Sequence, residues 1–353
     1  MRWLCTTLLC LGLPIAAQSQ PQTVRIGVLG IFHAQQLTLA PEESGGIVVS
    51  AGGQQILLQA RSACNLLRVR ASNDVLVLTC GAKEIQSKEL RAAGRNQQPA
   101  GFLLAVPGKI KRRYEGILDL KARKGELIPI VTMDLEVAVA SVVEAETAPG
   151  TPLEALKAQT IVSRSYLAAG GGRHEDFDFC DLTHCQALRE PPPLGSPARE
   201  AASATRNLVI AFNGRPIAAM FTRSCGGHTR TAKEIGLPQA EYPYYSVLCD
   251  VCHKSPFRWT RKVSLEDAAL LSLHGESARL AICRRLGWNA VPSNHFTARE
   301  QDGEVVLLGA GQGHGLGLCQ RGARGMAEQG SSFREILSHY FPNTKLEELH
   351  LKQ

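Results

Sequence analysis

The sequence predicts an α+β fold in which an antiparallel β-rich domain over residues 24–128 precedes a mixed α/β core domain over residues 129–349, which contains a substrate cleft. The first observation is a series of short apolar runs, among them VRIGVLG, GIVVSA and DVLVLTC, each separated by turn residues. Such spacing is typical of a small antiparallel sheet. The second is a change of period after Leu135, where apolar residues recur at three- and four-residue steps as on one face of a helix.

The stretch from Leu135 to Tyr166 reads as two helices joined at a Pro/Gly hinge, residues 148–152. Thr151, Pro152 and Glu154 have the spacing of an N-cap, a first helical residue and the third position of a capping box. The second helix is mostly apolar, so its polar side chains need partners if it is buried. They form either an internal network or one side of a cleft with Glu146 at its mouth.

The first residues have the pattern of a secretory signal peptide over residues 1–17. Arg2 supplies the positive end, an apolar run follows, and Ala16 and Ala17 provide a small-residue cleavage site. No later run of 18 apolar residues predicts a membrane span. We therefore expect an exported protein, at the periplasm or the cell surface.

The charge is moderately basic. The formal net charge is +7 and falls to +6 without Arg2. This value suits an acidic polymer as partner. No stripe of basic and aromatic residues indicates nucleic-acid binding.

Nine of the 11 cysteines follow the expected cleavage site, an odd number that leaves at least one outside any intramolecular disulfide. Cys64 and Cys80 flank an expected hairpin and form either a disulfide or two buried thiols. Two short cysteine-containing groups further on match structural zinc ligands, two local disulfides, for example Cys180–Cys185 and Cys249–Cys252, or free thiols. The zinc set would be Cys180, His184, Cys249 and Cys252.

Two further segments carry turn signals. The run from Leu208 to Ser224 predicts a hairpin with Asn213-Gly214 at its turn. It leads into a Cys-Gly-Gly-His-Thr segment, where the glycines indicate a tight turn or a close approach of a ligand to the backbone. The glycine-rich stretch 309–330 is not a phosphate-binding P-loop, because no Gly-Lys-Ser/Thr follows its glycines.

These motifs together resemble the stage II sporulation protein D (SpoIID/LytB) family, whose signature begins L-E-x-Y-x-x-G-V-V-x-x-E-M and continues E-A-L-K-A-Q-x-x-x-x-R-[ST]-Y. This chain has the matching residues at 135–136, 142–143, 146, 154–159 and 164–166. It departs from the signature at Ala138, Ser141 and Thr147. The glycine-rich segment 313–323, GHGLGLCQRGA, is similar to the family's G-H-G-x-G-[ML]-[SC]-Q-x-G-A. The resemblance extends over roughly residues 113–349.

The resemblance implies a peptidoglycan lytic transglycosylase that cuts the β-1,4 bond from N-acetylmuramic acid to N-acetylglucosamine in glycan strands stripped of stem peptides. Such an enzyme needs one carboxyl group in place of the usual two, and the signature places it at Glu146. Its pKa must be raised by apolar surroundings. The alternative is an exposed helix-end carboxylate of the kind expected at Glu144.

The expected substrate contacts come from the two motifs, with arginine and lysine available for the lactyl carboxylate of muramic acid. They are Lys157, Gln159, Arg164, Tyr166, His314 and Gln320. His314 is alternatively structural or a metal ligand. The reaction requires no cofactor, and a structural zinc ion is an open alternative for the cysteines.

Two other functions are compatible with the sequence. One is a non-catalytic glycan-binding module that enhances a cell-wall amidase. The other is a thiol hydrolase with Cys225 or Cys319 as nucleophile and His228 or His314 as base. An oxidising export route disfavours a free catalytic thiol.

Overall fold

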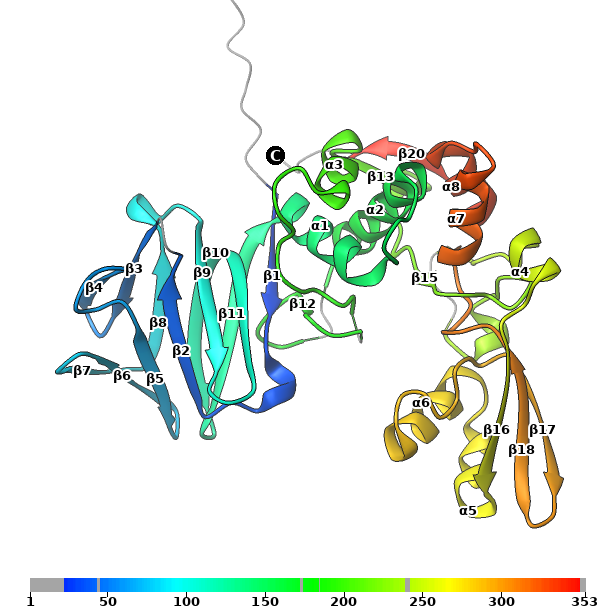
Figure 1. Cartoon of the computed structure of the whole chain (residues 1–353), viewed down its shortest axis with the longest axis horizontal. Helices are drawn as coiled ribbons and strands as arrows, with labels where there is room; N and C mark the ends of the chain where they lie inside the picture. The colour runs from blue at the N-terminus through cyan, green and yellow to red at the C-terminus, as the bar shows by residue number, and fades with distance from the viewer. Residues whose placement is uncertain (1–21, 43–44, 172–173, 184, 239–241, 350–353) are drawn as a thin grey trace, which may run out of the picture.

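The computed structural model describes residues 22–42, 45–171, 174–183, 185–238 and 242–349. A large strand-rich unit lies at one end, a group of helices lies in the middle, and a small sheet with its own helices forms the other end (Figure 1). The predicted α+β class, with its strand-rich N-terminal part, is confirmed. The predicted signal peptide, residues 1–17, lies outside the described residues. Within the described ranges, no helix combines the length and the apolar character that a membrane crossing requires.

The N-terminal unit is one curled sheet in which every pairing is antiparallel except that of β1 with β12. β10 (Ile110–Arg123) is its longest strand and joins two parts of the sheet. Its first half pairs with β9, and its second half pairs with β11 and β8. The other strands are β1 (Thr23–Gly27), β2 (Gln36–Pro41), β3 (Gly46–Ala51), β4 (Gln54–Gln59), β5 (Leu67–Ser72), β6 (Val75–Cys80), β7 (Lys83–Ser87), β8 (Glu89–Ala93), β9 (Ala100–Val106), β11 (Glu126–Asp134) and β12 (Phe179–Cys180).

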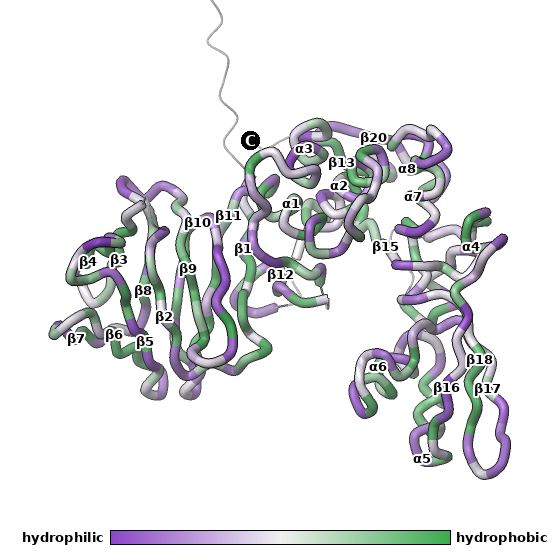
Figure 2. Tube along the Cα trace, in the orientation of Figure 1, coloured by the Kyte–Doolittle hydropathy of each residue, from purple (hydrophilic) through white to green (hydrophobic). Residues whose placement is uncertain are grey.

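Hydrophobic and hydrophilic positions are interleaved along these strands (Figure 2). In β3, for example, every second residue is buried, which is the period of a strand with one face in the core. The short 3₁₀ helices η1 (Gly30–Phe32) and η2 (Arg95–Gln97) lie in loops of the N-terminal unit. β11 crosses the expected domain boundary at residues 128/129 and leads directly into the first helix.

The predicted helix pair is present as α1 (Leu135–Glu146) and α2 (Leu153–Ala168). The Asp134 carboxylate caps α1 by accepting hydrogen bonds from the backbone N–H groups of Glu136 and Val137 at 2.8 and 3.3 Å. α1 packs on the sheet, and its apolar face belongs to the same core as the strands. α3 (Pro197–Ala204) contacts both helices.

The predicted capping box on α2 is wrong. Pro152 is the N-cap, and Thr151 Oγ1 donates to the carbonyl of Ala148 at 2.6 Å. The Glu154 carboxylate accepts instead from the backbone N–H of Phe333 at 2.8 Å. A contact with a distant segment has therefore replaced the local cap.

A second core lies between α2 and the C-terminal elements, around Ile161, Leu318 and Tyr340. The predicted hairpin is present as β13 (Leu208–Phe212) and β14 (Arg215–Pro216), with positive φ at both Asn213 and Gly214, as a type I′ turn requires. The remaining elements here are β15 (Phe221–Thr222), η3 (Lys233–Ile235), α4 (Asp250–Lys254), β19 (Leu318–Cys319), α7 (Gln320–Glu328), α8 (Phe333–Tyr340) and β20 (Lys345–Glu348).

The third unit has a small core of its own around Trp259, Ile282 and Leu307. Its three strands are antiparallel in the order β16, β18, β17. Its elements are β16 (Arg258–Ser264), α5 (Leu265–Ala268), η4 (Ala269–Leu273), α6 (Gly275–Leu286), β17 (Phe296–Gln301) and β18 (Glu304–Ala310). The division of the chain into domains at 128/129 stays a prediction.

Cys64 and Cys80 form a disulfide, with their Cα atoms 5.6 Å apart, which settles the choice between a bridge and two buried thiols. A bridge that closes a loop of this size stabilises by about 3 kcal/mol, because it restricts the unfolded chain. The double variant Cys64→Ser/Cys80→Ser should lower the free energy of unfolding by about 3 kcal/mol, as measured by urea denaturation. Equal midpoints for the variant and the wild type would contradict this contribution.

Candidate functional site

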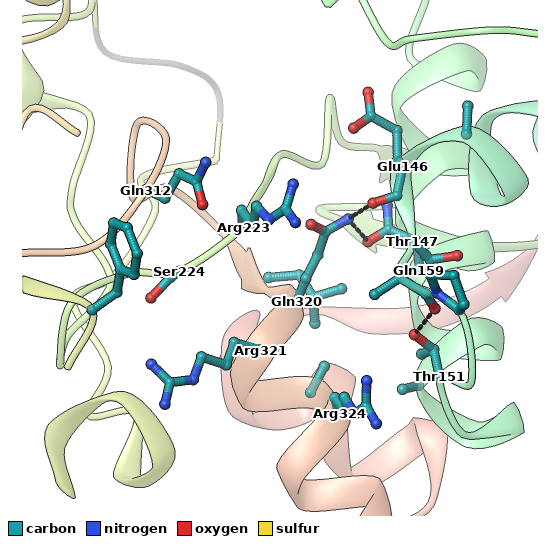
Figure 3. Close-up of a pocket in the computed structure, with 17 residues that line it drawn as sticks. Glu146, Thr147, Thr151, Gln159, Arg223, Ser224, Gln312, Gln320, Arg321 and Arg324 are labelled. Carbon is teal, nitrogen blue, oxygen red and sulfur yellow. Dashed lines mark hydrogen bonds between the residues drawn. The ribbon is translucent and has the colours of Figure 1, made fainter. Parts of the chain in front are cut away.

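A cavity of about 680 Å³ lies where the α1–α2 hinge faces β15, the glycine-rich segment and α7 (Figure 3). Its size is within the range of small-ligand pockets. One wall comes from the hinge and α2, and the opposite wall comes from segments more than 60 residues further along the chain. The lining residues are Ala145, Glu146, Thr147, Ala148, Pro149, Thr151, Ala155, Gln159, Arg223, Ser224, Phe257, Gln312, Leu318, Gln320, Arg321, Ala323 and Arg324.

Glu146 is the last residue of α1 and lines the cavity, partly buried, whereas Glu144 is exposed. One oxygen of its carboxyl group, Oε1, accepts a hydrogen bond from the backbone N–H of Ala187 at 2.9 Å. Burial raises the pKa of Glu146, against the opposing effects of that hydrogen bond and of the charges on Arg189 and Arg223. Its carboxyl group therefore keeps its proton to a higher pH than a solvated glutamic acid does.

Gln320 and Gln159 hold the two walls together. The side-chain nitrogen of Gln320, the first residue of α7, donates to the backbone carbonyl of Glu146 at 3.0 Å and to Gln159 Oε1 at 3.4 Å. Gln159 in turn donates to Ser163 Oγ at 3.2 Å. Both glutamines were expected to contact substrate, and both line the cavity.

Three arginines, Arg223, Arg321 and Arg324, make the opposite side of the cavity positive. The guanidinium of Arg321 donates to Ser255 Oγ at 3.3 Å, and that of Arg324 pairs with Glu328 at 2.8 Å. Sequence reasoning did not select them. The sequence did offer a signal for two of them. Arg321 and Arg324 closely follow Gln320, and residues three apart lie on one face of a helix.

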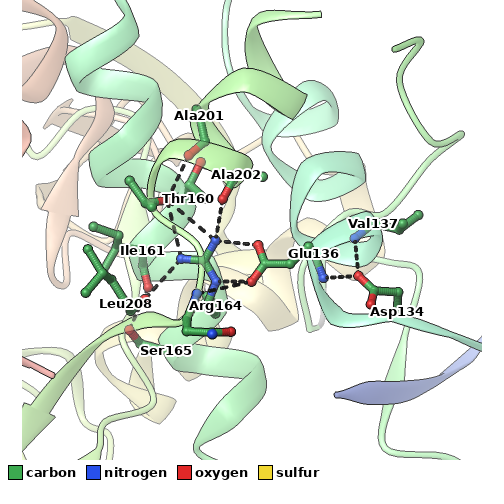
Figure 4. Close-up of polar contacts among 12 residues, drawn as sticks. Asp134, Glu136, Val137, Thr160, Ile161, Arg164, Ser165, Ala201, Ala202 and Leu208 are labelled. Atoms are coloured by element: carbon green, nitrogen blue, oxygen red, sulfur yellow. Dashed lines mark hydrogen bonds and ion pairs between the residues drawn. The ribbon is translucent and has the colours of Figure 1, made fainter. Parts of the chain in front are cut away.

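Arg164 was expected to contact substrate, but it is not among the residues that line the cavity, and its polar contacts are structural (Figure 4). Its guanidinium is fully buried and holds the Glu136 carboxylate through two hydrogen bonds of 2.9 and 2.6 Å. It also donates to the backbone carbonyls of Ala202 and Leu208 at 3.2 and 3.0 Å. The planar guanidinium suits such a bidentate pair, and every donor direction is used inside the protein.

The other three expected contacts are also absent from the lining. Lys157 pairs with Glu154 at 2.7 Å, and the Tyr166 ring packs on Phe179 with 5.5 Å between centroids. His314 Nδ1 accepts from the backbone N–H of Leu316 at 3.0 Å. Burial lowers the pKa of His314 to about 4, so the ring is neutral at pH 7.

The cysteines group differently from the expected zinc set. Cys249 and Cys252 lie with Cys225 and Cys319, whereas Cys180 lies with His174 and Cys185. His184 lies outside the described residues. The set that was predicted from short spacings is therefore not brought together, because spacing reveals only neighbours in the sequence.

The buried position of Cys225 and Cys319 bears on the thiol hydrolase hypothesis. Their side chains are 2% and 0% exposed. A nucleophile must reach its substrate, and neither thiol lines the cavity. This geometry disfavours that hypothesis.

Comparison with known proteins gives the same family that the motifs indicate. Residues 123–212, which include α1, the hinge and α2, match the model of the SpoIID family, described as stage II sporulation protein. An uncharacterized protein of Brachyspira hyodysenteriae is 28% identical over 261 residues, 65% of this chain and 70% of that protein. Stage II sporulation protein D of Bacillus amyloliquefaciens is 25% identical over 261 residues, 62% of this chain and 76% of that protein. An amidase enhancer of Bacillus subtilis is 22% identical over 274 residues, 55% of this chain but only 38% of the enhancer. The predicted resemblance is confirmed.

The role of Arg164 is testable through stability. Arg164→Met should lower the free energy of unfolding by about 3–5 kcal/mol, because Glu136, with a side chain that is only 13% exposed, is left without its partner. The control Lys262→Met breaks a solvent-exposed pair with Glu304 and should cost about 0–1 kcal/mol. Urea denaturation measures both. A variant of Arg164 with wild-type stability would contradict the structural role.

The raised pKa of Glu146 predicts a pH dependence of stability. The folded chain binds this proton more tightly than the unfolded chain does, so the contribution is complete below the ordinary pKa and is lost as pH rises through the raised value. Glu146→Gln removes the titration and keeps an Oε1 acceptor for Ala187. Relative to this variant, the wild type should lose stability as pH rises from 4 to 8, followed by thermal unfolding.

The matched control for this measurement is Glu144→Gln, which removes an exposed carboxyl group on the same helix. Identical pH dependences of stability in the two variants would show that the surroundings of Glu146 do not shift its pKa.

Proposed function

On the premise that this chain is a SpoIID-type protein, we propose that it is an exported lytic transglycosylase that cleaves the β-1,4 bond between N-acetylmuramic acid and N-acetylglucosamine in cell-wall glycan. The observation that carries the proposal is the carboxyl group of Glu146, whose pKa is raised at the edge of a cavity. Among the lining residues that the structure describes, it is the sole carboxylate.

A single carboxyl group limits the chemistry that is available. Ordinary glycoside hydrolysis uses two carboxyl groups, one as acid and one as base or nucleophile. With one, the nucleophile must come from the substrate. The 6-hydroxyl of the muramic acid ring meets this requirement, because its attack needs only the carboxylate that the first step leaves behind.

In the first step, protonated Glu146 gives its proton to the glycosidic oxygen, and the bond from C1 of muramic acid to that oxygen breaks. The leaving N-acetylglucosamine ends in a hydroxyl group. In the second step, the 6-hydroxyl oxygen attacks C1, and its proton passes to the Glu146 carboxylate. The product carries a 1,6-anhydro ring, no water is consumed, and Glu146 is protonated again.

The remaining lining residues suit this substrate. Gln320, which is only partly buried, offers hydrogen bonds to sugar hydroxyl and acetamido groups, whereas Gln159 is 1% exposed and holds Gln320 in place. Arg223 is exposed on the opposite side, where a guanidinium can pair with the lactyl carboxylate of muramic acid. A strand without stem peptides keeps that carboxylate free, so denuded glycan is the expected substrate.

A second candidate function is supported by the similarity to an amidase enhancer, at 22% identity. A chain of this kind would bind glycan in the same cavity and stimulate a separate cell-wall amidase. This candidate does not require Glu146 to exchange a proton.

Glu146→Gln should reduce release of anhydro-ended fragments from denuded glycan by at least about 100-fold, since general acid catalysis contributes about 10²–10⁴. Glu144→Gln, on the exposed face of the same helix, should keep wild-type activity. Mass spectrometry of the digest identifies the anhydro ends, and thermal unfolding confirms that both variants fold. Activity of the wild type should fall as pH rises through the raised pKa of Glu146, because the acid must start protonated.

Full activity of Glu146→Gln would overturn the assignment of the acid. Absence of anhydro ends with wild-type protein, together with glycan binding and stimulation of an added amidase, would favour the second candidate.

A further inference from the structure

Four cysteines from three separate parts of the chain converge beside the cavity. Cys225 follows β15, Cys249 and Cys252 belong to the start of α4, and Cys319 ends β19. All four sulfur atoms lie within 4.8 Å of one another. Each side chain is buried, with at most 2% exposed.

We propose that these four thiolates bind one zinc ion in a closed structural site. A tetrahedral ion with zinc–sulfur bonds of about 2.3 Å holds its sulfur atoms about 3.8 Å apart. The sulfur atoms of Cys252 and Cys319 are 3.6 Å apart. An iron–sulfur cluster divides its four cysteines between two or more iron atoms, which places some of the cysteine sulfur atoms further apart than the 4.8 Å that contains this group.

The surroundings supply hydrogen bonds that suit thiolates. The backbone N–H groups of Cys225 and Gly322 both donate to Cys319 Sγ at 3.4 Å. The hydroxyl of Tyr340 donates to Cys249 Sγ at 3.3 Å. Such outer contacts orient the ligands of a metal and stabilise their charge.

Gly322 is required for this arrangement. A Cβ atom at position 322 would collide with the Tyr340 hydroxyl and with Cys249 Sγ. The helix α7 therefore approaches the sulfur group through a residue without a side chain. Close packing of α7, α8 and α4 around four sulfur atoms is the geometry of a site that excludes water and offers no open coordination position.

The site would fix one side of the cavity. Ser224 precedes Cys225, and Gln320 and Arg321 follow Cys319, and all three line the cavity. Four bonds to one ion hold β15, α4 and the start of α7 at fixed distances from one another. Zinc binding by these cysteines does not depend on the proposed reaction.

The test must separate this group from His174, Cys180 and Cys185, whose ligand atoms also lie within 4.8 Å of one another. We therefore use the full chain with Cys180→Ser and Cys185→Ser as the reference protein. It should contain one zinc per chain after purification from medium that supplies both zinc and iron. X-ray absorption at the zinc edge should show four sulfur neighbours at about 2.3 Å.

Cys252→Ser in the reference protein should reduce the zinc content at least tenfold and lower the unfolding temperature. The matched control is Cys283→Ser, which changes a buried free cysteine outside the group and should keep one zinc per chain. If Cys252→Ser fails to fold, the absorption spectrum of the reference protein decides the question alone.

Four results would overturn the proposal. The first is a reference protein without zinc in which peptide mapping finds disulfides among the four cysteines. The second is iron in place of zinc. The third is zinc with nitrogen or oxygen among its neighbours. The fourth is an unchanged zinc content in Cys252→Ser.

Discussion

The buried ion pair between Arg164 and Glu136 is the interaction on which the arrangement of the site depends. The Arg164 side chain is fully buried and that of Glu136 is 13% exposed, and removing such charges from water costs several kcal/mol per fully buried ion. The cost is offset because the guanidinium makes two hydrogen bonds to the carboxylate and others to the carbonyls of Ala202 and Leu208. These contacts join α1 to α2, α3 and β13, so they fix the angle at which α1 runs toward the hinge and delivers Glu146 to the cavity.

The position of Glu146 on its helix adds to the effect of burial. It is the last residue of α1, where the unpaired carbonyls give the helix end a partial negative charge. A carboxylate is disfavoured there, and a protonated carboxyl group is not. Gln320 donates to the Glu146 carbonyl and so satisfies one of these groups without placing a full positive charge beside the carboxyl. Arg223 and Arg189 act in the opposite direction, which keeps the proton available for transfer.

The sequence predicts the elements whose causes are local. The period of apolar residues identifies both helices, and Asn213-Gly214 identifies a hairpin, because each needs only neighbouring residues. The failures involve distant partners. Glu154 has capping-box spacing, yet a backbone N–H 179 residues away competes successfully for its carboxylate. The positive charge of Arg164 would suit an anionic ligand, and only the fold shows that this charge is paired with the Glu136 carboxylate.

The residues of the candidate site also fall into two groups, those that a sequence motif identifies and those that only the fold brings to the cavity. Glu146, Gln159 and Gln320 were identified because the family motifs name them. Arg223 lies outside those motifs, and its place in the cavity depends on how β15 pairs with β19. The same pairing brings Cys225 to Cys319 across 94 residues. Rules that recognise metal ligands by their short spacing in the sequence cannot identify a pair that is so far apart.

The two walls of the cavity are built from different physical interactions. The hinge wall rests on helices with apolar faces and a buried ion pair. The facing wall is the glycine-rich segment 313–323, whose Leu316, Leu318 and Ala323 are buried in the second core. Polar contacts add to this packing: Thr222 Oγ1 donates to the carbonyl of Gln312 at 3.0 Å and accepts from the backbone N–H of Gly315 at 3.1 Å. The cysteine group lies beside this wall, where a bound ion would restrain Ser224 and Gln320 together.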